Sequence, residues 1–226
     1  MSTAQLIATA ASIVTGLFLA GLLLAERRRD RRLRYLTKPI ASAGFIAVCA
    51  FGGGLGDPTG YVPWVLAGLI LGAGGDVALM FSGDRPFIAG LVSFLLGHLA
   101  YVIACAQLLP PENWLIAYAA GPIIAAAIVT RYLWPHLGSM KVPVVFYVVT
   151  ITVMVISAIA VVLSDQRQAL DDRRAIMLFA GALAFFASDV SVARDRFVAP
   201  GFINKAWGLP AYYAGQLLFA WSTVWS

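Results

Sequence analysis

The sequence predicts an all-α polytopic membrane protein, a single bundle of eight transmembrane helices. Of its 226 residues, 61% are hydrophobic and only 12% are charged, and the mean hydropathy is +0.84. Soluble domains carry about 25% charged residues, so this balance is typical of a chain embedded in lipid. Apolar stretches of about 20 residues, the length that a membrane-spanning helix needs, follow one another closely. One transmembrane domain over 1–226 is therefore expected, with no room for a soluble domain.

Eight stretches fit this length. In chain order they are 4–25, 37–56, 61–81, 86–109, 113–134, 140–163, 174–194 and 203–225. The first has its basic residues after it rather than before it, unlike a cleavable signal peptide, so it is expected to remain as a helix. The second opens at Lys38 and Pro39. The third carries Gly68 and Gly72, a spacing that lets a neighbouring helix approach closely. Several other stretches contain Gly and Pro, which membrane helices tolerate.

Basic residues gather on one side of the predicted bundle. Of the 16 Lys and Arg residues, only Arg167, Arg173 and Arg174 fall on the opposite side. Cytoplasmic loops are enriched in Lys and Arg, so we expect these loops in the cytoplasm and both termini outside, in the inner membrane of a bacterium. Topology and contact with anionic headgroups thus account for the net charge of +5, and no nucleic-acid partner is predicted. The sequence does not fix an oligomeric state.

Two aspartates lie inside apolar stretches in similar surroundings. Asp76 stands in GDVALM on the third stretch and Asp189 in SDVSVA on the seventh. An acidic side chain at membrane depth costs about 2.5–3.5 kcal/mol on insertion scales and usually marks a functional site. Each lies about six residues, or roughly 9 Å, from the basic-side end of its helix, which predicts a paired-carboxyl site. The similarity between the two motifs fits a duplication into two parallel four-helix halves, about 1–109 and 110–226, and it fits chance equally well.

Further polar side chains are predicted near the aspartates, whereas the outer halves of the helices carry almost no ionisable residue. They are Lys38, Tyr147, Tyr212, Tyr213, Gln216 and, deeper, His98, with Arg85, Arg194 and Arg196 at the rim. This distribution describes a pocket open to the cytoplasm or inner leaflet better than a path through the membrane. Structural explanations stay open: aspartates that pair with basic residues to fasten helices, a histidine packed in the core, and tyrosines of the interfacial belt.

Two carboxyls in a water-poor site favour general acid–base chemistry. Neighbouring carboxyls ionise at different pH values, so one can donate a proton while the other is ionised. This suits reactions through an oxocarbenium-like cation. Hydrolysis of a vinyl ether is such a reaction: the β-carbon is protonated, water adds, and the hemiacetal collapses to an aldehyde and an alcohol. His98 and His136 are the only histidines and lie at different depths, so no zinc site is expected.

Several motifs follow one another in an order and spacing typical of one family. They are Lys38-Pro39, GDVALM around Asp76, Phe87 through Gly97-His98 to Tyr101, Pro143 to Tyr147, Ser188-Asp189 with Arg196-Phe197, and Tyr212-Tyr213 with Gln216. Together they resemble the YhhN-like lysoplasmalogenase family of membrane proteins over most of the chain. The chain departs from the family's pattern at Gly215, where Ala is usual, and at Val192, where Leu is frequent.

The resemblance implies an eight-helix membrane enzyme that hydrolyses the vinyl ether bond of lysoplasmalogens. The products are a fatty aldehyde and glycerophosphocholine or glycerophosphoethanolamine, and no metal or organic cofactor is required. The implied catalytic pair is Asp76 and Asp189, and the implied phosphate ligands are Lys38 and Arg196. The residues implied to place water and the ether oxygen are Tyr147, His98, Tyr212, Tyr213 and Gln216.

The resemblance also implies that the partner is a lysophospholipid, whose alkenyl chain lies on apolar helix faces. Two other functions stay open on the sequence. A proton-coupled transporter of a small amphiphile would use intramembrane aspartates as a proton relay. A non-catalytic lipid-binding protein would use them to hold its helices together.

Overall fold

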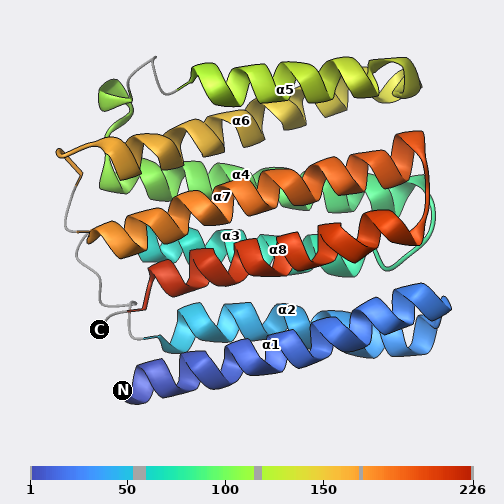
Figure 1. Cartoon of the computed structure of the whole chain (residues 1–226), viewed down its shortest axis with the longest axis horizontal. Helices are drawn as coiled ribbons and strands as arrows, with labels where there is room; N and C mark the ends of the chain where they lie inside the picture. Colours follow the sequence, from blue (N-terminus) through green and yellow to red (C-terminus); the bar gives the residue numbers. More distant parts are fainter. Residues whose placement is uncertain (1, 53–59, 115–118, 168–169, 225–226) are drawn as a thin grey trace.

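The computed structural model describes residues 2–52, 60–114, 119–167 and 170–224. Over these residues the chain is all-α, and its eight α-helices lie side by side along one common direction (Figure 1). They are α1 (Thr3–Arg28), α2 (Arg31–Phe51), α3 (Tyr61–Ala78), α4 (Asp84–Leu108), α5 (Ala120–Leu133), α6 (Lys141–Leu163), α7 (Asp172–Ala193) and α8 (Phe202–Ser222). α1 begins and α8 ends at one end of the bundle. The connections α1–α2, α3–α4, α5–α6 and α7–α8 lie at the other end, called the basic end below.

Three antiparallel helix pairs make the most extensive contacts: α1 with α2, α3 with α4, and α7 with α8. α3 also contacts α2 and α8, and α6 contacts both α4 and α7. α5 lies outermost, against α6 (Figure 1). The helices that carry the two aspartates, α3 and α7, therefore each pack against at least two other helices.

Five helices in the described part of the chain are long and apolar enough to cross a membrane. They are α1, α3, α4, and α6 and α7 together with their adjoining turns. The chain is therefore an integral membrane protein. α5 has 14 residues and spans roughly 21 Å, less than the hydrocarbon core of about 30 Å. Eight crossings, the orientation of the basic end, and the division into one domain or two halves remain predictions.

Two helix boundaries correct the sequence-based expectation. α2 begins at Arg31 rather than at 37, because Asp30 caps it by accepting a hydrogen bond from the Leu33 amide at 3.1 Å. Of the basic segment expected to be a loop, Glu26 to Lys38, residues 26–28 thus end α1 and residues 31–38 form the first turns of α2. α5 begins at Ala120 rather than at 113, since Pro111–Asn113 form a separate 3-10 turn. Residues 115–118 of the expected helix lie outside the described residues.

Glycines on α3 allow the close packing that the sequence predicts. A Cβ atom on Gly68 would lie 2.5 Å from the ring of Tyr101, and one on Gly72 would lie 2.2 Å from Nε2 of Gln216. Gly215 on α8 has a similar role, because an added Cβ would lie 3.0 Å from the carbonyl oxygen of Gly181 on α7. The departure from alanine at this position therefore matches a close approach of the two helices.

Candidate functional site

Asp76 is buried on α3 and is held by groups from two neighbouring helices. Its Oδ1 atom lies 3.1 Å from Nζ of Lys38, and its Oδ2 atom accepts a hydrogen bond from Oγ of Ser42 at 2.6 Å. Lys38 and Ser42 are four residues apart on α2, so they share one face of that helix. The hydroxyl of Tyr212 on α8 also interacts with the carboxylate. Asp76 is thus one member of a buried ion pair and has further hydrogen-bond partners.

Tyr213 and Gln216 form hydrogen bonds with the residues that contact Asp76. The hydroxyl of Tyr213 donates to the carbonyl of Lys38 at 3.3 Å and lies 3.2 Å from Oγ of Ser42. The amide of Gln216 donates to the hydroxyl of Tyr212 at 3.1 Å. Tyr213 and Gln216 are fully buried, and neither is among the described residues that line the pocket at Asp76. Both predicted site residues therefore belong to the supporting layer around Asp76.

Asp189 on α7 has different neighbours. The hydroxyl of Tyr147 on α6 donates to its Oδ2 atom at 2.8 Å. Nε2 of His98 on α4 lies 3.4 Å from the same oxygen, but neither ring nitrogen of this buried histidine has a hydrogen-bond partner among the described residues. Among the described residues, no Lys or Arg side chain forms a salt bridge with Asp189. Its side chain is 15% exposed, against 3% for Asp76.

Both aspartates line one pocket of about 420 Å³. Lys38 and Tyr212 form part of its inner wall. Its outer wall consists of residues from the basic end of the bundle. The charged ones are Glu26, Arg34, Asp195, Arg196 and Lys205. The structure therefore brings the two predicted carboxyls to one cavity that leads toward the basic end.

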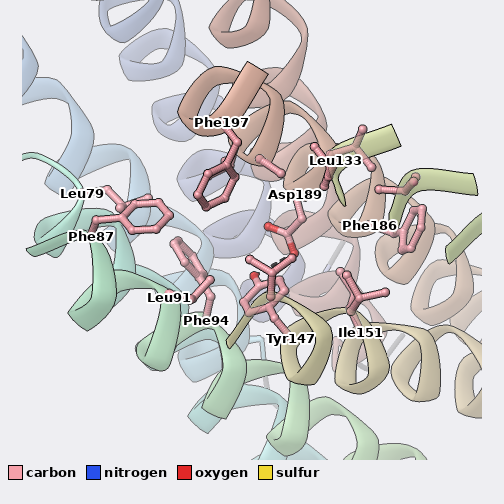
Figure 2. A pocket seen from close by; sticks show the side chains of 16 residues that line it. Leu79, Phe87, Leu91, Phe94, Leu133, Tyr147, Ile151, Phe186, Asp189 and Phe197 are labelled. Carbon is pink, nitrogen blue, oxygen red and sulfur yellow. Dashed lines mark hydrogen bonds between the residues drawn. The ribbon is translucent and has the colours of Figure 1, made fainter. Parts of the chain in front are cut away.

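A narrow apolar cleft of about 60 Å³ adjoins this pocket at Asp189 (Figure 2). Asp189 and Tyr147 supply polar atoms to its lining, and the rest is made by aliphatic and aromatic side chains from α4, α5, α6 and α7, with Leu79 after α3 and Phe197 in the turn after α7. Phe87 and Phe94 line both the pocket and the cleft. Asp189 thus stands where a polar cavity meets an apolar one.

Arg196 lies at the mouth of the pocket, in a π-helical turn (Arg194–Val198) that follows α7. Its guanidinium forms an ion pair with Asp84 at the start of α4 and lies 4.5 Å from the ring centre of Phe87. Arg196 therefore faces the predicted pocket but pairs with a rim carboxylate rather than with Asp76 or Asp189.

Sequence reasoning missed Ser42, although its position four residues after Lys38 places both on one helical face. It also treated Arg34 and Lys205 only as charges that set topology, whereas both line the pocket. Glu26, which pairs with both of them, was missed as well. Within the described chain, no three His, Cys, Asp or Glu side chains gather as a metal ligand set.

Comparisons with known proteins give a consistent result. The sequence model of the YhhN family matches residues 33–223. Proteins named lysoplasmalogenase from Mycobacterium bovis and Mycobacterium tuberculosis are 29% identical over 164 residues, which cover 69% of this chain and 58% of theirs. A human protein of that name is 32% identical over 165 residues, which cover 71% of this chain and 65% of its own. The chain thus spans less than two thirds of these relatives. No solved structure matches the chain significantly.

Proposed function

The chain belongs to the YhhN family, and we propose that it is a membrane hydrolase that cleaves the vinyl ether bond of lysoplasmalogens. The products are a fatty aldehyde and a glycerophospho-alcohol. The observation that carries the proposal is the shared pocket: Asp76 and Asp189 line one polar cavity, and an apolar cleft begins at Asp189. The relatives named lysoplasmalogenase support the same reaction class at modest identity.

The two cavities match the two ends of a lysolipid. The glycerol and headgroup fit the polar pocket with its charged outer wall, and the first carbons of the alkenyl chain fit the apolar cleft. The cleft is narrow, so the remainder of the chain lies along the helix surface in lipid. The vinyl ether bond, which joins glycerol to chain, then falls beside Asp189.

The neighbours of each aspartate support different roles. Asp76 pairs with the ammonium of Lys38, so we assign it as the base that takes a proton from water. Asp189 has a phenol and an imidazole as neighbours, so it is the acid that protonates the β-carbon of the vinyl ether. Tyr147 orients Asp189, Lys38 orients Asp76, and Tyr212 reaches the pocket where water must bind.

These roles close a complete catalytic cycle. Asp189 gives its proton to the β-carbon and leaves an oxocarbenium ion. Water adds to the carbon that bears the oxygen, and Asp76 takes a proton from this water, which gives a neutral hemiacetal. Asp76 then returns that proton to the leaving glycerol oxygen while Asp189 takes the proton of the hemiacetal hydroxyl. The carbon–oxygen bond breaks, aldehyde and alcohol leave, and both aspartates regain their starting states.

Replacement of each aspartate tests the proposal. Purified protein given lysoplasmalogen should release fatty aldehyde, measured with a coupled aldehyde dehydrogenase. Asp76→Asn and Asp189→Asn should each lower turnover by about 10²–10⁴-fold, the usual contribution of a general acid or base. Asp165→Asn, in an exposed turn at the opposite end of the bundle, is the matched control and should keep full activity.

Circular dichroism and thermal unfolding of the same preparations show whether each variant is folded. Near-normal turnover in either folded aspartate variant would refute the two-carboxyl mechanism. Proton flux driven by the amphiphile in proteoliposomes, without release of aldehyde, would instead indicate a transporter.

A further inference from the structure

A second polar pocket, of about 440 Å³, lies beside the site at the basic end of the bundle. Six residues line both this pocket and the one that holds the aspartates. They are Glu26, Arg34, Ser82, Asp195, Pro200 and Lys205. The polar part of the site thus extends beyond the space that a glycerol unit needs, and its outer portion is bordered by charges of both signs.

Glu26 joins two of these charges. Nζ of Lys205 lies 2.9 Å from Oε2 of Glu26, and Nη1 of Arg34 lies 3.7 Å from Oε1. Two cations therefore share one carboxylate. The described lining of the second pocket holds five basic and three acidic side chains, so it carries a net positive charge: Arg27, Arg29, Arg31, Arg34 and Lys205 against Glu26, Asp30 and Asp195. The nearby cation Lys38 is different, because it is paired with Asp76.

Arg34 is held in place by one hydrogen bond, and its Nε atom is a further donor. Its Nη2 atom donates to the carbonyl of Met80 at 2.9 Å. Its Nε atom is buried but has no hydrogen-bond partner within the described part of the chain. A buried donor without a partner is costly, so an acceptor group on a ligand in the pocket would satisfy it. Phosphate oxygens are well suited acceptors for a guanidinium.

Asp195 supplies the opposite charge on the same wall. Its Oδ1 atom accepts hydrogen bonds from the amide of Gly201 at 2.8 Å and from Nδ2 of the fully buried Asn204 at 3.1 Å. These bonds fix the carboxylate, which stands with Glu26 and Asp30 among the acidic side chains that line the second pocket. A fixed anion next to an excess of positive charge favours a ligand that carries both signs.

We propose that this wall binds a zwitterionic phosphodiester headgroup, with Arg34 and Lys205 on the phosphate and Asp195 on the ammonium. The inference rests on the proposed function for the class of lipid, and it assigns the residues that hold the headgroup. It places the phosphate away from the ion pair of Lys38 and Asp76, so that binding of the headgroup leaves the reacting carboxyls undisturbed.

Binding of ligands that cannot be hydrolysed tests the proposal without turnover. The probes are a saturated 1-alkyl-glycerophosphoethanolamine, the matching 1-alkyl-glycerophosphate without an amine, and 1-alkylglycerol without a phosphate. Arg34→Gln and Lys205→Met should each weaken binding of the two phosphate ligands roughly tenfold or more, because a hydrogen bond to a charged group is lost. Binding of 1-alkylglycerol should be unchanged. Asp195→Asn should weaken only the ethanolamine ligand.

Two further variants guard against a structural effect. Lys205→Arg keeps the charge and should bind all three ligands normally. Arg85→Gln removes an exposed basic residue of the same end that lines neither pocket, and it should also have no effect. Equal losses for phosphate ligands and 1-alkylglycerol, or the same loss in Arg85→Gln, would overturn the inference. The ligands can bind in the predicted pattern while the vinyl ether substrate yields no aldehyde. That outcome would refute the proposed reaction and leave the headgroup site supported.

Discussion

The surroundings of Asp76 and Asp189 differ although their sequence motifs are alike. Asp76 is almost completely buried, pairs with the ammonium of Lys38, and accepts a hydrogen bond from Ser42. Asp189 is more exposed, accepts its hydrogen bond from the phenol of Tyr147, and stands at the entrance to an apolar cleft. One carboxyl is neutralised by a cation from a neighbouring helix, and the other pairs with no Lys or Arg among the described residues.

The difference teaches that the neighbours, rather than the motif, assign a carboxyl its chemistry. Both aspartates follow a small residue and precede valine, yet their partners come from different helices: α2 and α8 for Asp76, and α4 and α6 for Asp189. If the comparison is correct, loss of the partner should have unequal consequences at the two positions.

The largest effect on stability is expected from Lys38→Met. This change leaves the Asp76 carboxylate buried without its cation, and breaking a buried ion pair from one side costs about 3–5 kcal/mol. Unfolding of the purified protein in mixed micelles measures the loss. The double variant Lys38→Met with Asp76→Asn should recover much of it, because no unpaired charge then remains. A Lys38→Met protein as stable as the wild type would show that Asp76 is not held as an ion pair.

A smaller effect is expected at the other carboxyl from Tyr147→Phe. The variant loses one hydrogen bond to Asp189, worth about 0.5–1.5 kcal/mol, and no charge is left without a counterion. Turnover should also fall, because Asp189 loses the group that orients it. Tyr132→Phe on α5, where the side chain is 46% exposed, serves as the control. A cost in Tyr147→Phe as large as that in Lys38→Met would remove the distinction between the two carboxyls.

The hydropathy pattern predicted the eight helices well because burial in lipid or in the bundle demands continuous apolar stretches. It placed the start of α2 too late, since charged residues such as Arg31 and Arg34 were assigned to a loop although Asp30 caps a helix there. It placed the start of α5 too early, because apolar residues alone do not reveal that Pro111–Asn113 form a separate 3-10 turn.

The sequence predicted some of the polar residues that meet at the pocket, but not how they pair. Counting residues along the predicted helices places Lys38, Asp76, Tyr147 and Asp189 near one depth. This count needs the sequence alone. Which cation meets which carboxyl depends on how the helices rotate against one another, and the sequence pattern does not specify that rotation. Arg34 shows the limit most clearly: its charge fitted a topology rule, so nothing distinguished it from the neighbouring arginines.

The smallest effect on stability, and a test of the role of Asp189, is expected from His98→Phe. The imidazole is fully buried, and its ring packs edge-on against Tyr147 and Phe185. A phenyl ring keeps these contacts and removes two nitrogens that lack hydrogen-bond partners in the described chain. The free energy of unfolding should therefore change by less than about 1 kcal/mol.

Turnover of His98→Phe separates a packing histidine from one that serves the reaction. Nε2 lies 3.4 Å from the Asp189 oxygen that also accepts from Tyr147, and catalytic hydrogen bonds are often long before substrate binds. We expect turnover to fall about tenfold while stability is kept, because Asp189 loses a polar neighbour 3.4 Å from its Oδ2 atom. Unchanged turnover would assign His98 to packing alone and leave Tyr147 as the one partner that distinguishes Asp189 from Asp76.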